Sequence, residues 1–209
     1  MSTGAARLLE LAFDPAVGAY EDPMSQRILD AALALAAASG LRHLTMDDVA
    51  ARAGVGRMTV YRRFGSRQQL TDALAVRECR RCLNEIGAAL DPSKPIDERA
   101  ADLFLATLRV IREHPLLERL ARVEPEALLY ELNRDGSAVF RLVRDFLVTQ
   151  IRLAQASDEL IEVDPEPLAE IAVRLGASFV LMPDSVIAAG DERRTRETIR
   201  ALIAPVLNR

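Results

Sequence analysis

The sequence predicts an all-α protein, and three observations carry that prediction. Half of the 209 residues are hydrophobic, yet only 4% are aromatic and tryptophan is absent. This composition suits Ala- and Leu-rich helices better than sheets, which favour aromatic and β-branched residues. Apolar residues recur at helical spacing in one segment after another, and apolar runs that alternate with period two are missing.

The first predicted helix begins at Asp22-Pro23, after an N-terminal extension over residues 1–21. Asp22 is a suitable N-cap, and Pro23 suits the first helical position because its missing N–H has no partner there. Gly40 is expected to end this helix. Its apolar residues at helical spacing are Ile28, Leu29, Ala32, Leu35 and Ala36.

Two short helices are predicted next, joined by a tight turn. Thr45 can cap the first of them, and Asp47 and Asp48 lie in its first turn, where the helix dipole favours negative charge. Gly54 interrupts this helix and supplies the positive φ that a tight turn requires. A second short helix follows over residues 57–64. The pair has the proportions of a helix-turn-helix.

The remainder of the chain is also predicted to be helical. Gly65-Ser66 separates the short pair from a long helix over residues 67–90, which ends at a break with two prolines. The later predicted helices are 96–113, a short one after His114-Pro115, 125–133, 137–158, 165–182 and 191–207.

Positive charge is concentrated in the predicted helix-turn-helix. The whole chain has 27 basic and 31 acidic residues, a net charge of −4 that by itself argues against a nucleic-acid partner. Residues 21–81, however, carry 10 basic and 7 acidic groups, whereas residues 82–209 carry 16 and 22. No acidic residue occurs from Val49 through Thr71. The arginines of that stretch are Arg52, Arg57, Arg62, Arg63 and Arg67.

These residues carry a resemblance to a known family. The segment GVGRMTVYRRFGSRQQL, preceded by LTMDDVAARA, resembles the DNA-binding region of the TetR family of bacterial transcriptional regulators, over about residues 25–74. The resemblance implies a three-helix DNA-binding domain at residues 22–67, followed by a helical ligand-binding and dimerisation domain at residues 68–209. It further implies a repressor that binds a palindromic double-stranded DNA operator as a homodimer. A small, largely apolar effector, such as an acyl derivative, a lactone or a hydrophobic drug, would release it.

The resemblance also places the second short helix in the major groove. Arg57 is then expected to read a guanine through its O6 and N7 acceptors, and Met58 to contact a thymine methyl group. Two residues depart from the family pattern: Gly56 stands where Ser is frequent, and Arg63 where an aromatic residue or His is frequent. The residues expected to contact the DNA backbone are Thr45, Thr59, Tyr61, Arg62, Arg63 and Arg67.

The C-terminal two-thirds is expected to provide the dimer interface and the effector pocket. Alternatively, the apolar stripes that predict both sites face the chain's own core. The candidate interface residues are Leu168, Ile171, Leu175, Met182, Ile199, Leu202, Ile203 and Val206. The candidate effector residues are Phe104, Thr107, Leu108, Ile111, Tyr130, Val143, Phe146, Gln150 and Ser178.

Other classes of function receive less support. Cys79-x-x-Cys82 leaves open a thiol redox-sensing regulator, but zinc needs about four ligands and neither histidine has a partner at ligand spacing. A helical adaptor that does not bind DNA is a further alternative. No nucleophile elbow, P-loop, dinucleotide fingerprint or HExxH motif occurs, so we expect no enzyme, cofactor or metal. No apolar run reaches membrane-spanning length and no secretory signal is evident, which predicts a cytoplasmic protein.

Overall fold

The computed structural model describes residues 20–133, 136–157, 159–182, 185, 187 and 191–207, with the backbone alone at residue 131 and residues 203–207. Within these residues the chain forms ten α-helices and one short 3₁₀ helix and contains no strand. The predicted all-α fold is therefore confirmed. The helices predicted after residue 66 also begin and end within two residues of their observed bounds.

The described residues fall into two compact units. The helix-turn-helix unit combines residues 20–80 with residues 114–139, and the second unit combines residues 81–113 with the described residues from 140 onward. The division between these two compact units falls inside the long helix α5 (Arg67–Ala88). Residues 114–139 join the first unit because their helices pack against a helix some 80 positions earlier in the chain, which periodicity does not reveal.

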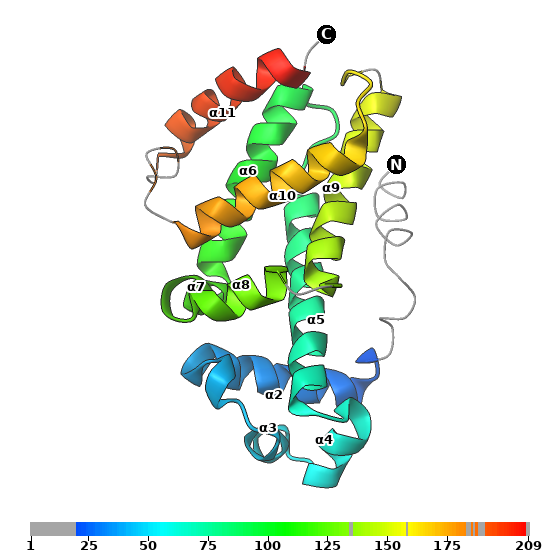
Figure 1. Cartoon of the computed structure of the whole chain (residues 1–209), viewed down its shortest axis with the longest axis vertical. Helices are drawn as coiled ribbons and strands as arrows, with labels where there is room; N and C mark the ends of the chain where they lie inside the picture. The colour runs from blue at the N-terminus through cyan, green and yellow to red at the C-terminus, as the bar shows by residue number, and fades with distance from the viewer. Residues whose placement is uncertain are drawn as a thin grey trace. The chain divides into compact units, whose positions relative to one another are not determined.

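Local capping signals set the beginning of the helix-turn-helix unit, whose helices α2, α3 and α4 Figure 1 shows in blue to cyan. Helix α2 (Pro23–Ser39) starts at Asp22, whose side chain accepts hydrogen bonds of 3.1 Å from the backbone N–H groups of Met24 and Ser25. The 3₁₀ helix η2 (Leu41–His43) leads from α2 to α3 (Met46–Ala53). Gly54 then adopts φ +63° and ψ +39°, the predicted left-handed turn, and α4 (Arg57–Phe64) follows.

An apolar core holds α3 and α4 against α2. Val49 and Val60 are fully buried, and Phe64 is 1% exposed and stacks on Tyr20 with ring centroids 4.6 Å apart. Burying one such side chain stabilises the fold by about 1.5–3 kcal/mol. The other core residues contributed by α2 and α5 include Ile28, Leu29, Leu70 and Leu74. This core fixes the angle between the two short helices and therefore the direction in which α4 presents its outer side.

Helices α7 (Pro115–Val123) and α8 (Pro125–Asn133) complete this unit. His114 caps α7 by accepting from the Leu117 N–H, and its other ring nitrogen lies 3.0 Å from a carboxylate oxygen of the buried Glu78 on α5. Burial raises the pKa of Glu78, but its hydrogen bond to His114 and the charge of Arg77 outweigh that effect and hold the pKa below the ordinary 4.5.

The second unit contains α6 (Ile96–Glu113), α9 (Ala138–Ala156), α10 (Pro165–Leu181) and α11 (Glu192–Leu207). Helices α6 and α11 lie side by side (Figure 1) and are joined by ion pairs. Arg200 lies 2.8 Å from Asp97, and the buried Asp102 pairs with Lys94 at 2.8 Å and with Arg196. Among the described residues, no helix is both long and apolar enough to cross a membrane.

Candidate nucleic-acid interface

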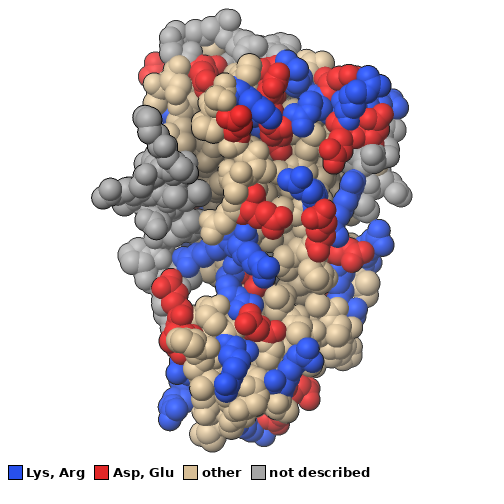
Figure 2. All heavy atoms as spheres, turned by 180° about the vertical axis from the view of Figure 1, so that it is seen from behind, with Lys and Arg blue, Asp and Glu red and all other residues tan. Residues whose placement is uncertain are grey.

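The outer side of α4 is the candidate interface. Val60 and Phe64 point into the core, so the helical repeat leaves Arg57, Met58 and Arg62 on the surface. Met58 is 76% exposed, so its side chain is accessible to a partner that meets this side of α4. Charge alone does not single out this surface, because Figure 2 shows basic and acidic side chains interspersed over the face it presents.

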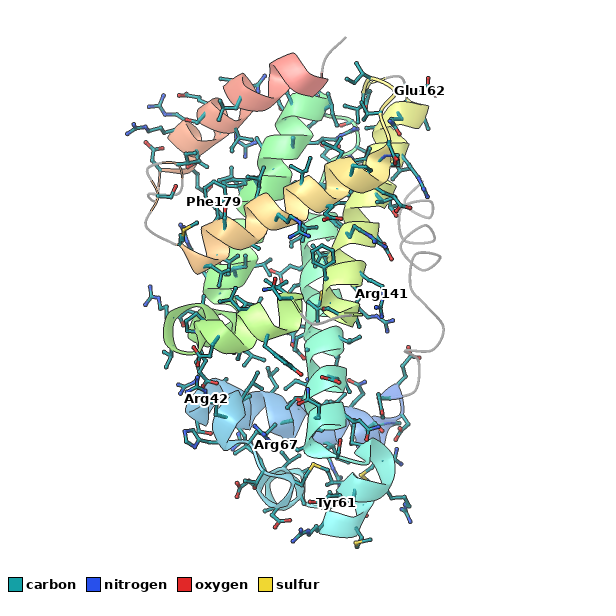
Figure 3. All side chains as sticks on the ribbon, viewed as in Figure 1. Arg42, Tyr61, Arg67, Arg141, Glu162 and Phe179 are labelled. Carbon is teal, nitrogen blue, oxygen red and sulfur yellow. The ribbon has the colours of Figure 1, made fainter. Side chains whose placement is uncertain are left out.

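Arg57, the predicted guanine reader, is held between α3 and α4. Its Nε lies 3.0 Å from one carboxylate oxygen of Asp47, and another of its N–H groups donates to the second oxygen, also at 3.0 Å. The guanidinium carbon is 5.3 Å from the ring centre of Tyr61, which Figure 3 labels on α4. A hydrogen bond to Tyr61, and next the charge of Asp47, raise the pKa of Arg57 above its usual value.

Thr45 performs the predicted capping role. Its hydroxyl accepts from the Asp48 N–H at 3.1 Å and donates to the Asp48 carboxylate at 2.6 Å. A phosphate contact by this hydroxyl therefore has to replace one of these bonds. Gly56, which stands where Ser is frequent in the family, provides no side-chain cap for α4, and Thr59 is half-buried on the first turn.

Arg63 and Arg67 were expected at phosphates, but both guanidinium groups lie against the protein. Arg63 donates to Asp22 at 2.6 Å and to the Ser25 hydroxyl at 2.8 Å, contacts that tie α4 to the start of α2. Arg67 donates to the backbone carbonyls of Leu44 at 2.8 Å and Leu41 at 2.6 Å. A third, longer bond of 3.3 Å reaches the Arg42 carbonyl. Contacts of either arginine to phosphate would compete with these bonds.

Arg52 and Arg62 remain as the positive charges best placed for phosphates. Both are exposed, and across the part of the chain that the structure describes, neither takes part in an ion pair or hydrogen bond. Arg52 lies in the last turn of α3 and Arg62 in the last turn of α4, one on each helix of the motif. A B-DNA major groove, about 12 Å wide, accommodates a helix with such side chains.

The candidate effector residues have different surroundings in the described part of the chain. Phe104 packs edge-on against Phe179 at 5.0 Å, and the hydroxyls of Thr107 and Ser178 donate to carbonyls of their own helices. Tyr130 belongs to the helix-turn-helix unit, unlike the rest of the set, and is 56% exposed. Phe146 is buried, and the remaining members, which are half-buried, are Leu108, Ile111, Val143 and Gln150.

Two hollows in the described part of the second unit bear on the effector prediction. The larger, about 320 Å³, is apolar and is lined by the segment before α10 and the first turns of that helix, including Leu160, Leu168 and Ile171. The smaller, about 160 Å³, lies between α6 and α11 and includes Leu108. Leu108 is the one candidate effector residue that lines either of these two hollows.

Four of the candidate interface residues are exposed, three of them on α10 or directly after it and one on α11. Leu168 is half-buried, whereas Ile199 is 6% exposed and packs within its own chain. The side chains of Ile203 and Val206 lie outside the described residues. The exposed members are Ile171 (56%), Leu175 (58%), Met182 (64%) and Leu202 (60%).

The cysteine pair gives no sign of a metal centre. Cys79 is partly buried and Cys82 is buried, and neither forms a disulfide. No group of three or more His, Cys, Asp or Glu side chains comes together at metal-binding distance within the described segments.

The described chain is helical, and a glycine turn joins two short helices, the second of which exposes arginine and methionine side chains. These features define a helix-turn-helix DNA-binding protein. Residues 28–74 match the family model for bacterial regulatory proteins of the tetR family. The HTH-type transcriptional regulator AlkX of Mycobacterium tuberculosis is 34% identical over 196 residues, which cover 88% of this chain and 87% of that protein. The chain therefore belongs to the TetR family of bacterial transcriptional regulators.

Solved structures agree with this assignment. The TetR family repressor AlkX from Dietzia sp. has a TM-score of 0.63 and 24% identity, and the match covers 89% of this chain and 95% of that one. The transcriptional repressor QsdR from R. erythropolis has a TM-score of 0.62 and 25% identity, with coverage of 90% and 95%. These relatives are transcriptional regulators and not enzymes, as the sequence predicts for this chain.

Proposed function

We propose that this regulator is a repressor that binds a palindromic operator as a homodimer and leaves it when a small, largely apolar effector binds. The observation that carries the proposal is the outer side of α4, where Arg57 and the 76% exposed Met58 stand at the start of the helix. In a helix-turn-helix, these first residues of the second helix lie nearest the base edges.

The proposed DNA contacts follow from this placement. Arg57 reads a guanine with its unoccupied N–H groups and Met58 contacts a thymine methyl group. Arg52 and Arg62 neutralise phosphates on either side, and the Tyr61 hydroxyl adds a backbone contact. Further contacts to the DNA backbone are proposed for Thr45, Thr59, Arg63 and Arg67. For Thr45, Arg63 and Arg67, such a contact requires the side chain to exchange or extend its present bonds.

A dimer is proposed because one recognition helix reads only a few base pairs. Ile171 and Leu175 on α10 and Leu202 on α11 are exposed apolar side chains, and a second copy of the chain can cover them. Leu175→Glu and Leu202→Glu should shift the sedimentation coefficient from dimer to monomer. Leu153→Glu, which places the same charge on α9, is the matched control. A protein that sediments as a monomer before mutation contradicts the proposal.

The effector is proposed to carry an aliphatic chain. The Dietzia AlkX repressor is described as implicated in biodegradation of n-alkanes, and FadR from Bacillus halodurans, with 18% identity and a TM-score of 0.63, as a fatty acid degradation regulator. The apolar side chains along α6 and α9, with Phe104 and Phe146 among them, suit such a ligand. The ligand releases DNA only if it binds the released arrangement more tightly than the bound one.

Footprinting and thermal shift test the proposal together. The protein should protect two half-sites whose centres lie about 10 base pairs, or a multiple of that, apart. The protein is then titrated with n-alkanes and fatty acids, and separately with a lactone and with a hydrophobic drug. One of these classes of compound should raise the melting temperature of the protein and remove the footprint. A single protected half-site contradicts the dimer, and a footprint that persists with every compound contradicts the effector class.

A further inference from the structure

Asp47 and Arg57 form the one ion pair that joins the two helices of the motif among the described residues. Asp47 lies in the first turn of α3 and Arg57 is the first residue of α4, ten positions later. Two bonds of 3.0 Å connect the side chains, which are 57% and 61% exposed. The contact therefore lies on the same surface as the proposed base-reading residues.

The carboxylate restricts what the guanidinium can do. A guanidinium has five N–H donors, of which Asp47 occupies two and the hydrogen bond to Tyr61 one more, so the rest remain available to a base edge. An unrestrained arginine on this surface would also reach phosphates, which occur at every sequence and add affinity without specificity. To reach a phosphate, Arg57 has to leave Asp47, and the negative charge of Asp47 opposes a phosphate nearby.

We propose that Asp47 is a positioning residue that sets sequence specificity, because it holds Arg57 toward base edges and away from phosphates. This inference rests on the proposed base contact of Arg57. The inference predicts that the Asp47 carboxylate lowers the affinity for DNA of arbitrary sequence. It also predicts that the carboxylate increases the ratio of the affinity for the operator to the affinity for arbitrary DNA. The Tyr61 ring, 5.3 Å from the guanidinium carbon, supports the same orientation.

Asp48 provides a matched control in the same turn of α3. It has the same charge, but its carboxylate accepts from the Thr45 hydroxyl at 2.6 Å, and Asp47 is the carboxylate that contacts Arg57. Asp47→Asn and Asp48→Asn therefore remove equal charge at adjacent positions, and only the first releases Arg57. The Asp48 backbone N–H that Thr45 caps is retained in Asp48→Asn, and circular dichroism checks that both variants fold.

The experiment uses the full chain and an operator selected by the unaltered protein from a random duplex library. Affinity for this operator and for a scrambled duplex is measured over a range of salt concentrations. Asp47→Asn should reduce the ratio of the two affinities about tenfold, which is the order of one bidentate base contact. Its salt slope on the scrambled duplex should steepen by about 0.9, the effect of one added phosphate contact. Asp48→Asn should raise both affinities alike and leave the ratio unchanged.

Two further variants separate failure of this inference from failure of the proposed function. In the Arg57→Ala background, Asp47→Asn should change the affinity ratio no more than Asp48→Asn does. Asp47→Glu keeps a carboxylate, so its ratio of operator affinity to scrambled-duplex affinity should be close to that of the unaltered protein and well above that of Asp47→Asn. If Arg57→Ala reduces specificity but Asp47→Asn and Asp48→Asn give equal ratios, the role of Asp47 is refuted while the base contact stands. If Arg57→Ala leaves specificity unchanged, the base contact itself is refuted.

Discussion

Replacement of Arg67 measures how much this residue stabilises the fold, separately from the phosphate contact proposed for it. The guanidinium donates to the Leu44 and Leu41 carbonyls at 2.8 and 2.6 Å and joins the start of α5 to η2. A hydrogen bond to a charged group contributes about 1.5–3 kcal/mol, and less where water can replace the partner. The Leu44 bond is partly buried and the Leu41 bond is exposed, so we expect Arg67→Ala to lower the free energy of unfolding by about 2 kcal/mol.

Arg67→Lys sharpens this test because it keeps the charge. A single ammonium group cannot occupy the positions of both Nε and the terminal nitrogen, so this variant should lose about 1 kcal/mol. Arg62→Ala is the control. It removes the same positive charge from an exposed position and should change the free energy of unfolding by less than about 0.5 kcal/mol.

Urea unfolding followed by helical circular dichroism measures these differences. All variants must be compared at one protein concentration, because assembly contributes to apparent stability. Arg67→Ala with the same unfolding free energy as Arg62→Ala would refute the structural role. A fall of about 0.9 in the salt slope of Arg67→Ala for DNA would separately support the phosphate contact proposed for Arg67.

Three other predictions concern the turn, the core and acid sensitivity. Gly54→Ala should cost about 1 kcal/mol because φ is +63°, whereas Gly54→Asn should cost less, and equal losses in urea unfolding would contradict the turn geometry. Phe64→Ala should lose about 3–5 kcal/mol and Phe64→Leu far less, and a loss below about 1 kcal/mol for the alanine variant would show that Phe64 is not central to the core. The lowered pKa of Glu78 predicts a stabilisation that is fully present above the ordinary value of 4.5 and is lost as pH falls through the lower folded value. Unfolding free energies between about pH 5 and about pH 3 should therefore depend less on pH in Glu78→Gln, and an unchanged dependence would contradict this.

Features encoded by neighbouring residues could be predicted from the sequence. Asp22 before Pro23 marks the start of α2, and Gly54 between two short apolar patterns marks the turn. Capping and positive φ are properties of a few consecutive residues, so one sequence suffices to recognise them. The family resemblance added the groove-facing side of α4, which local patterns alone do not identify.

Features that depend on distant parts of the chain could not be predicted in this way. Arg63 and Arg67 occupy positions where positive charge is expected to meet phosphate, yet their partners are Asp22 and the carbonyls of η2. An arginine side chain long enough to reach DNA also reaches across its own domain, and only the packed structure shows which partner it takes. The packing of α7 against α2 is a second contact of this kind.

The Asp47–Arg57 pair could have been predicted from the sequence, but Asp47 was explained by its favourable position in the helix dipole. Its place in the first turn of α3 is explained by the helix dipole, so the sequence offered no reason to look for a further contact. Yet an acidic residue ten positions before an arginine, across a turn of known geometry, lies within reach of it. A helix-turn-helix sequence with an acid and a base at these two positions therefore warrants inspection for the same pair.

The base preference of Arg57→Ala tests the central claim most directly. Duplexes selected from a random library by the unaltered protein and by Arg57→Ala should share one consensus, apart from a single guanine per half-site that only the unaltered protein requires. Affinity for the operator should fall by about 1–3 kcal/mol in that variant. The same consensus with the same affinity would show that α4 does not read DNA through Arg57 and would contradict the assignment of its outer side as the recognition surface.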